Sequence, residues 1–134
     1  MKLIIDNNIL FSLMKPDSVA SRILLFLNCE LTAPSFILHE FNKYKDECLK
    51  KSGLSKINFD KRKNEILSKI NFIEFKEYKE FLKEALKELI DQDDSPYIAL
   101  GLKIQSPIWS NDKNLKKQSK VTILSTEDLI HILF

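Results

Sequence analysis

Four acidic side chains, spread over more than a hundred residues, are the residues of this chain best suited to act together in catalysis. They are Asp6, Glu40, Asp94 and Asp112. If the fold brings them within a few ångströms, they repel one another and all stay ionised at neutral pH only where cations neutralise them. A site made of oxygen ligands, with room for water, is the kind that Mg²⁺ or Mn²⁺ occupies. Such a metal site can hydrolyse a phosphodiester bond, which is the chemistry of nucleases.

The stretch from Asp91 to Asp112 contains two of these acids and is expected to form a helix followed by a strand. Asp94 or Ser95 can cap the helix, which is almost wholly apolar over residues 97–104 and is therefore expected to be buried. A short strand is expected at 108–110, so that Asp112 lies just past its carboxyl end. Taken alone, each aspartate can equally be a helix cap or a turn residue.

The other two acids also lie where a sheet edge is expected. Asp6 follows the run Lys-Leu-Ile-Ile at residues 2–5, which is typical of a buried strand. Glu40 falls on the same face as Ile37 and Phe41 in a helix expected to begin at Ser35. A carboxylate on an inward face is costly unless it is paired or metal-bound, although a glutamate at the boundary can also reach solvent. Because ligands bind at the carboxyl ends of the strands in open parallel sheets, we expect the four acids to meet there.

The rest of the chain alternates between short strands and amphipathic helices. Further strands are expected at 31–33, 72–75 and 121–124. Helices are expected after a cap at Asn8, after a cap at Asp17 or Ser18, over 35–48, 50–69 and 78–89, and after a capping box at 125–128. This alternation predicts a parallel sheet that is covered by helices on both faces.

The composition indicates a single helix-rich globular domain over residues 1–134. The chain has two glycines, four prolines, 44% hydrophobic and 30% charged residues. Its apolar start meets Asp6 too early for a signal peptide, and no apolar run approaches the roughly 18 residues of a membrane span, so we expect a cytoplasmic protein. Cys29 and Cys48 are expected to be reduced, buried thiols, and both histidines to be structural. A net charge of +2 indicates nothing by itself about a polyanionic partner.

In this order and at these separations, the acidic motifs resemble the PIN domain family, small metal-dependent ribonucleases that include the VapC-type toxins of toxin–antitoxin pairs. The resemblance covers the whole chain. Its elements are Asp6-x-Asn8 after the first strand, Glu40 early in the third helix, the D-x-x-D-x-P run that begins at Asp91, and the W-S-x-D sequence at 109–112. The family's active acid in the D-x-x-D-x-P run is the one before x-Pro, here Asp94, so Asp91 is read as a rim residue and Asp93 as solvated.

The resemblance implies a three-layer α/β/α sandwich around a parallel sheet of strand order 3-2-1-4-5. It also implies that Asp6, Glu40, Asp94 and Asp112 bind Mg²⁺ or Mn²⁺ and carry catalysis. Asn8 and Ser110 match positions that support those acids through hydrogen bonds. Gly101 stands where relatives have alanine, which suggests close packing at that point. A homodimer or higher oligomer and an antitoxin protein are the partners that the resemblance suggests.

The first hypothesis is a metal-dependent endoribonuclease that hydrolyses RNA, plausibly the toxin of a toxin–antitoxin pair. Lys113, Lys116, Lys117 and Lys120 would then contact phosphates, or they form a solvated face. The alternative is a non-catalytic or RNA-processing PIN module that binds RNA or a protein partner. A more remote alternative is a metal-dependent phosphatase or receiver-like domain. The strand expected at 121–124 ends in Ser125 rather than lysine, which counts against a receiver.

Overall fold

The computed structural model describes residues 2–134 and contains a parallel sheet of five strands in the order β3-β2-β1-β4-β5. This is the predicted strand order. The strands are β1 (Lys2–Ile5), β2 (Glu30–Pro34), β3 (Ile70–Ile73), β4 (Ile108–Trp109) and β5 (Ile123–Leu124). β1 lies at the centre, with Lys2 opposite Glu30 of β2 and Ile4 opposite Ile108 of β4. The chain reverses its direction of winding at β1, so the edge where β1 and β4 end is the expected place for a ligand.

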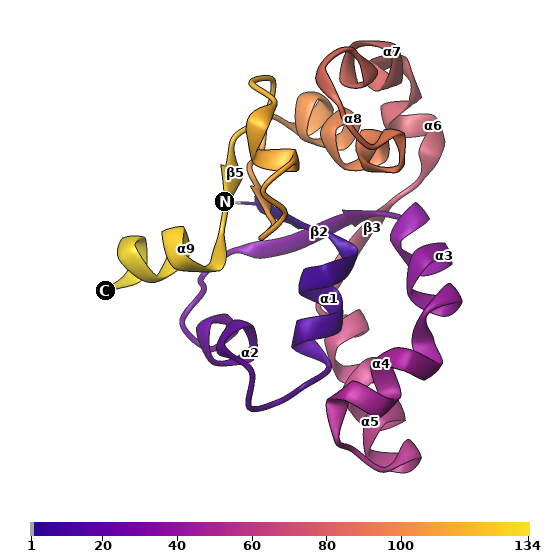
Figure 1. Cartoon of the computed structure of the whole chain (residues 1–134), viewed down its shortest axis with the longest axis vertical. Helices are drawn as coiled ribbons and strands as arrows, with labels where there is room; N and C mark the ends of the chain where they lie inside the picture. Colours follow the sequence, from indigo (N-terminus) through magenta and orange to yellow (C-terminus); the bar gives the residue numbers. More distant parts are fainter. Residues whose placement is uncertain (1) are drawn as a thin grey trace.

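Helices cover both faces of the sheet, as expected for a sandwich of three layers (Figure 1). One layer holds α1 (Asn7–Leu13), α2 (Val19–Leu24), α3 (Phe36–Lys43), α4 (Lys45–Ser52), α5 (Lys56–Ser68) and α9 (Thr126–Leu133). The opposite layer holds α6 (Phe75–Tyr78), α7 (Leu82–Ala85) and α8 (Ser95–Ile104). Short 3₁₀ turns lie at Lys79–Phe81, Leu86–Glu88, Gln92–Asp94 and Leu115–Lys117. Within residues 2–134, none of the helices combines the length and apolar character needed to cross a bilayer.

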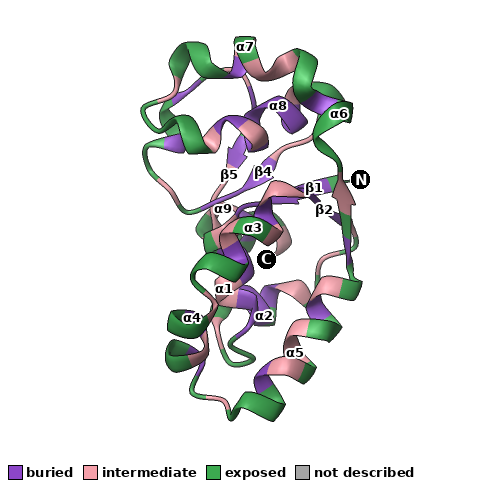
Figure 2. Cartoon of the chain, turned by 90° about the vertical axis from the view of Figure 1, so that its right-hand side faces the viewer, coloured by how far each residue is buried: buried purple, intermediate pink, exposed green. Residues whose placement is uncertain are grey.

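The core lies between the sheet and the two helical layers (Figure 2). Trp109 of β4 and the aliphatic residues 3–5 of β1 are wholly buried, and Trp109 Nε1 donates a hydrogen bond to Thr126 Oγ1 at 3.0 Å. Cys48 is buried, as predicted, whereas Cys29 is only partly buried. Burying the central strands fixes the point at which each strand emerges, which is what places the acids that follow them.

Several predicted helices are interrupted in the structure. The helix predicted over 35–48 breaks at Tyr44, whose φ of −112° separates α3 from α4. The helix predicted over 50–69 is wrong as one element, because Gly53 adopts φ 71° at the end of α4 and Ser55 caps α5. The stripe at 78–89 is divided between α6, α7 and two 3₁₀ turns. The break at Gly53 thus follows a local signal, a glycine that ends one helix and a serine that caps the next.

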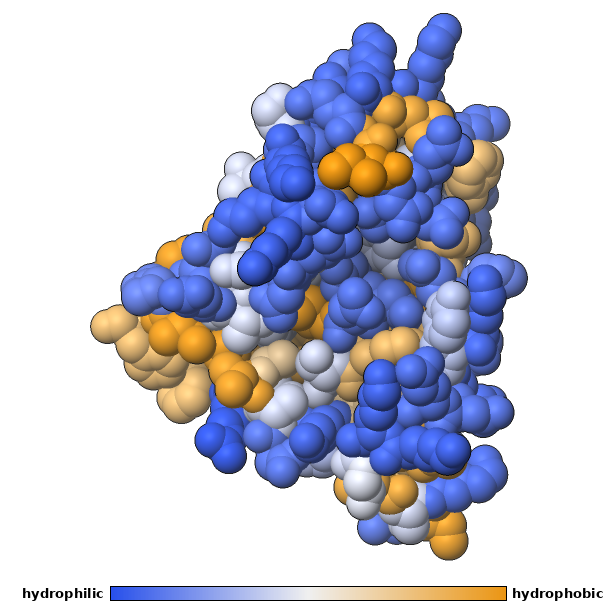
Figure 3. Space-filling model, in the orientation of Figure 1, coloured by the Kyte–Doolittle hydropathy of each residue, from blue (hydrophilic) through white to orange (hydrophobic). Residues whose placement is uncertain are grey.

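Smaller differences concern the helix caps and the strand ends. Asp6 rather than Asn8 caps α1, while Ser18 caps α2 and the capping box of Ser125 and Asp128 is present as predicted. The strand predicted at 72–75 begins two residues earlier, and the fourth and fifth strands are shorter than predicted. Phe26, which follows α2, is 60% exposed and packs edge-to-face on Phe134 at 5.3 Å. Figure 3 shows apolar side chains gathered at this end of α9 on an otherwise mostly hydrophilic face.

Gly101 in α8 packs closely, as its identity suggested. A Cβ added there would lie 2.7 Å from Cγ1 and 3.0 Å from Cγ2 of Val121. We expect Gly101→Ala to lower the free energy of unfolding by about 1 kcal/mol, because overpacking outweighs the gain in helix propensity. In a Val121→Ala background the same change should instead stabilise the protein. Thermal unfolding of the four proteins measures this, and destabilisation in both backgrounds would refute the proposed clash.

Candidate active site

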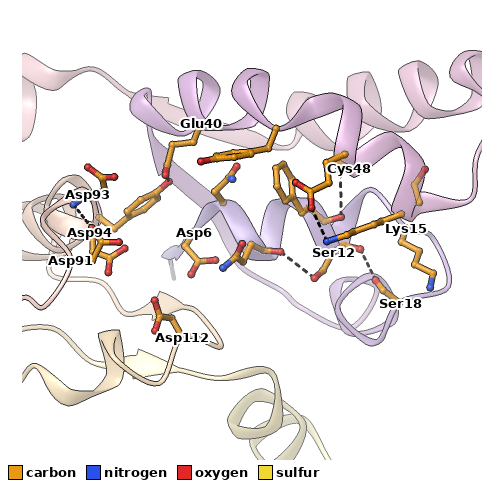
Figure 4. A pocket seen from close by; sticks show the side chains of 18 residues that line it. Asp6, Ser12, Lys15, Ser18, Glu40, Cys48, Asp91, Asp93, Asp94 and Asp112 are labelled. Carbon is orange, nitrogen blue, oxygen red and sulfur yellow. Dashed lines mark hydrogen bonds and ion pairs between the residues drawn. The ribbon is translucent and has the colours of Figure 1, made fainter.

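All four predicted acids line one cavity of about 630 Å³ that opens where β1 and β4 end. Asp91 and Asp93 line the same cavity. Figure 4 shows the six labelled carboxylates together at one end of it, contributed by the junction of β1 and α1, by α3, by the turn before α8 and by the loop after β4. The chain thus collects carboxylates from four separate segments into one concave surface.

Asp6 is held by two hydrogen bonds at the end of β1. Its Oδ1 accepts from the backbone N–H of Ile9 at 2.9 Å, which caps α1, and its Oδ2 accepts from the hydroxyl of Ser110. Only 8% of Asp6 is exposed, and this burial raises its pKa above the ordinary value. The two hydrogen bonds lower the pKa of Asp6 in part, and the charge of Asp112 raises it. A positive charge in the cavity would therefore stabilise the ionised form of Asp6.

Glu40 receives a hydrogen bond from the hydroxyl of Tyr97, a residue of α8. Burial raises the pKa of Glu40, the bond from Tyr97 opposes this, and the charges of Asp93, Asp6 and Asp91 raise it further. The ring of Tyr97 is 2% exposed, and burial raises its pKa as well, so it stays a neutral donor. The sequence signal for this contact is a tyrosine hydroxyl near the start of an otherwise apolar helix, which does not by itself identify Glu40 as the partner.

Asp94 is the acid whose ionisation the site opposes most clearly. Burial, followed by the charges of Asp112, Asp91, Asp6 and Glu40, raises the pKa of Asp94 to about 7. Asp94 occupies the N-cap position of α8, but its side chain accepts no capping hydrogen bond there, contrary to the expectation that it or Ser95 would do so. Its carboxylate is therefore available to the cavity. Asp91 caps the preceding 3₁₀ turn through a 2.9 Å bond from the N–H of Asp93.

Asp112 is fixed by the loop that follows β4. Its Oδ1 accepts from the backbone N–H of Asn114 at 2.8 Å, and its own N–H donates to Ser110 Oγ at 3.1 Å. Ser110 therefore links Asp6 and Asp112, since its hydroxyl donates to one and accepts from the backbone of the other. The side chain of Asn8 lines the cavity but makes no hydrogen bond to the acids within residues 2–134.

The donor set fits a hard divalent cation such as Mg²⁺ or Mn²⁺, because every candidate ligand is oxygen. Asn7, which lines the cavity, has a buried side-chain oxygen with no hydrogen-bond partner, and a cation or an ordered water would satisfy it. Among residues 2–134, no three acidic, histidine or cysteine side chains are already placed to hold one ion directly. Mg²⁺ commonly uses one or two carboxylates and keeps several waters, so binding needs waters or inward rotation of side chains.

The lysines predicted to contact RNA do not line this cavity. Lys116 pairs with Asp128 at 2.6 Å, and Lys120 pairs with Glu84 at 2.6 Å and Glu88 at 3.6 Å. Lys120 thereby joins the loop before β5 to the α7 region. The lysines that do line the cavity are Lys15, which follows α1, and Lys51 of α4. Neither lysine belongs to a sequence motif, so the sequence did not predict them.

The fold and the site together define a small α/β protein with an acidic cavity at the carboxyl edge of its sheet. A family model described as PIN domain matches residues 4–131, and the chain therefore belongs to the PIN domain family. The sequence matches no curated protein.

Several solved structures share the fold. VapBC2 from Rickettsia felis, bound to a DNA fragment from its promoter, has 17% identity and a TM-score of 0.71, over 93% of this chain and 98% of that chain. A toxin–antitoxin complex from Klebsiella pneumoniae has 17% identity and a TM-score of 0.66, over 90% and 95%. PAE2754 from Pyrobaculum aerophilum has 18% identity and a TM-score of 0.69, over 99% and 89%.

Proposed function

We propose that this PIN domain protein is a Mg²⁺- or Mn²⁺-dependent endoribonuclease. One observation carries the proposal: Asp6, Glu40, Asp94 and Asp112, from four separate segments, line a single cavity in which the pKa of Asp94 is raised to about 7. Carboxylates that oppose one another's ionisation form a site for cations, and such perturbed groups gather at functional sites.

In this proposal Asp6, Glu40, Asp94 and Asp112 hold the divalent cation. When bound, the cation would lower the pKa of a coordinated water and place a positive charge beside the phosphate under attack. Ser110 and Tyr97 orient Asp6 and Glu40 through the hydrogen bonds described above. Burial of Asp6 keeps its carboxylate in one orientation, so that little reorganisation is needed when substrate binds.

The biological setting we propose is that of a toxin paired with an antitoxin protein, acting in the cytoplasm as a homodimer or higher oligomer. Its support is that two structures of the same fold are VapBC2 and a toxin–antitoxin complex. A small reading frame encoding an antitoxin should then lie beside the gene, whereas an RNA-processing enzyme needs no such neighbour.

The direct test is incubation of the purified chain with a structured RNA, with EDTA, Mg²⁺ or Mn²⁺. We expect internal cleavage only with metal. Calorimetric titration with Mn²⁺ provides a second measurement that does not depend on choosing a cleavable RNA. Absence of both cleavage and Mn²⁺ binding at millimolar concentration would overturn the nuclease and favour the alternative, a binding module.

Tyr97→Phe should reduce cleavage about tenfold at pH 7, because it removes a hydrogen bond to a charged group while keeping the ring. Without that bond the pKa of Glu40 rises further, since burial is then less opposed. The loss should therefore shrink as the pH is raised. The rate of RNA cleavage from pH 6 to pH 9 measures this. Tyr78→Phe is the control, because Tyr78 is a buried tyrosine that does not line the cavity.

A further inference from the structure

The cavity extends beyond the carboxylates into a second region, which we call the arm. It is lined by Ser12 and Lys15 on one side and by Tyr44, Glu47, Cys48 and Lys51 on the other. Figure 4 shows Ser12, Lys15, Ser18 and Cys48 at the end of the cavity opposite the labelled acids. We propose that the arm binds the single-stranded RNA segment adjacent to the phosphate that is cleaved. This inference rests on the proposed function and specifies how its substrate is held.

The arm is a groove between two helices rather than an isolated depression. Tyr44, Cys48 and Lys51 are spaced four and three residues apart, so they share one face along α4. Glu40 lies in α3, just before the break at Tyr44, and lines the same cavity, so the wall of the arm adjoins the acidic end. From Tyr44 to Lys51 the wall is roughly 10 Å long, at about 1.5 Å per helical residue. That length suits one or two nucleotides beyond the phosphate at the carboxylates.

The charges in the arm favour a phosphate backbone. The carboxylates repel an approaching phosphate, whereas Lys15 and Lys51 lie at the far end of the same cavity. Within residues 2–134, Lys15 has no ion-pair partner. Lys51 pairs with Glu47 at 3.1 Å, but both side chains are largely exposed, so this pair contributes little and can give way to a phosphate. An extended strand would thus have one phosphate at the acidic end and the next near the lysines.

Tyr44 supplies the feature that favours an unpaired base. Its side chain lines the cavity and is 43% exposed, between the acids and the lysines. Aromatic rings next to basic side chains bind single strands by stacking on bases, whereas bases stacked within a duplex are unavailable to them. The ammonium of Lys43 lies 5.4 Å from the centre of the ring and adds positive charge beside the arm.

The test measures binding apart from cleavage. A fluorescent RNA octamer is titrated with the full chain in EDTA, by anisotropy, between 50 and 200 mM salt. Lys15→Gln and Lys51→Gln should each weaken binding about 3- to 10-fold and each reduce the salt slope by about 0.7, the value for one lost phosphate contact on a single strand. Tyr44→Ala should weaken binding by at least about fivefold, and Tyr44→Phe should not. Lys83→Gln is the matched control, because Lys83 of α7 is exposed and does not line the cavity.

The outcomes separate this inference from the proposed function. If Lys15→Gln, Lys51→Gln and Tyr44→Ala all bind RNA as the Lys83→Gln control does, the arm is not an RNA site and a protein segment becomes its better occupant. Failure of the wild-type chain to bind the octamer overturns the inference as well. If the variants lose affinity as expected but the wild-type chain cleaves no RNA with Mn²⁺, the arm stands and the nuclease proposal falls.

Discussion

Asp6→Asn should leave a folded protein whose metal-dependent cleavage is slower by about 10³-fold or more, since it removes a charge at the point where the proposed cation binds. Asparagine keeps the shape of the side chain, and its oxygen can still accept from the N–H of Ile9, so the cap of α1 is preserved. The hydroxyl of Ser110 can reverse its role and accept from the new amide. The substitution therefore isolates the charge from the fold.

Asp17→Asn is the matched control for this prediction, because Asp17 is exposed and does not line the cavity. Both variants should unfold at or above the melting temperature of the wild type. Cleavage rates are measured at saturating Mn²⁺ with the RNA used for the wild type. If Asp6→Asn cleaves within a few-fold of Asp17→Asn, the carboxylates are not the catalytic centre.

Local sequence predicts those parts of the site that depend on a single strand or a single helix. An uninterrupted aliphatic run predicts a buried central strand, so it also predicts where Asp6 emerges. The apolar sequence of α8 predicts a buried helix, and residues 97–101 are buried. Trp109 marks the short strand before Asp112. The order of these elements then leaves few topologies for a parallel sheet, which is why the strand order is predictable.

The parts that could not be predicted depend on packing between distant segments. The bond from Tyr97 to Glu40 joins residues 57 apart, and that from Ser110 to Asp6 joins residues 104 apart. Ser110 was found only through the resemblance. Lys15 reaches the cavity because α1 packs near the break at Tyr44, and no periodicity in the sequence shows that break. The high density of lysine at 113–120 suggested an RNA-binding segment, yet two of these lysines form ion pairs with acidic side chains of the protein.

The metal-free protein should become less stable as the pH rises from about 4 to about 7. A carboxyl group whose pKa is higher in the folded than in the unfolded chain binds its proton more tightly when folded, so deprotonation favours unfolding. For Asp94 this window runs from its ordinary pKa of 3.8 to about 7, and the raised pKa values of Asp6 and Glu40 act in the same direction. Glu84, whose pKa is lowered to about 2, acts in the opposite direction only below about pH 4.

Asp94→Asn should therefore raise the stability of the metal-free protein at pH 7.5 by about 1 to 2 kcal/mol, allowing for solvent screening of a partly exposed group. This corresponds to a melting temperature about 3 to 6 °C higher. The gain should become small near pH 4, because Asp94 of the unfolded chain, with its ordinary pKa of 3.8, only begins to ionise there. The same substitution should remove most of the stabilisation that Mn²⁺ gives the wild type at pH 7.5.

Asp93→Asn tests whether Asp94 is the acid responsible, because Asp93 is its exposed neighbour in the same turn. It should change the melting temperature and the response to Mn²⁺ much less. Melting curves from pH 4 to pH 8, with EDTA and with Mn²⁺, measure all three proteins. A metal-free melting temperature that is constant from pH 5 to pH 7.5 would mean that the carboxylates do not oppose one another's ionisation. A larger effect of Asp93→Asn than of Asp94→Asn would mean that Asp93, rather than Asp94, is the acid whose ionisation the site opposes.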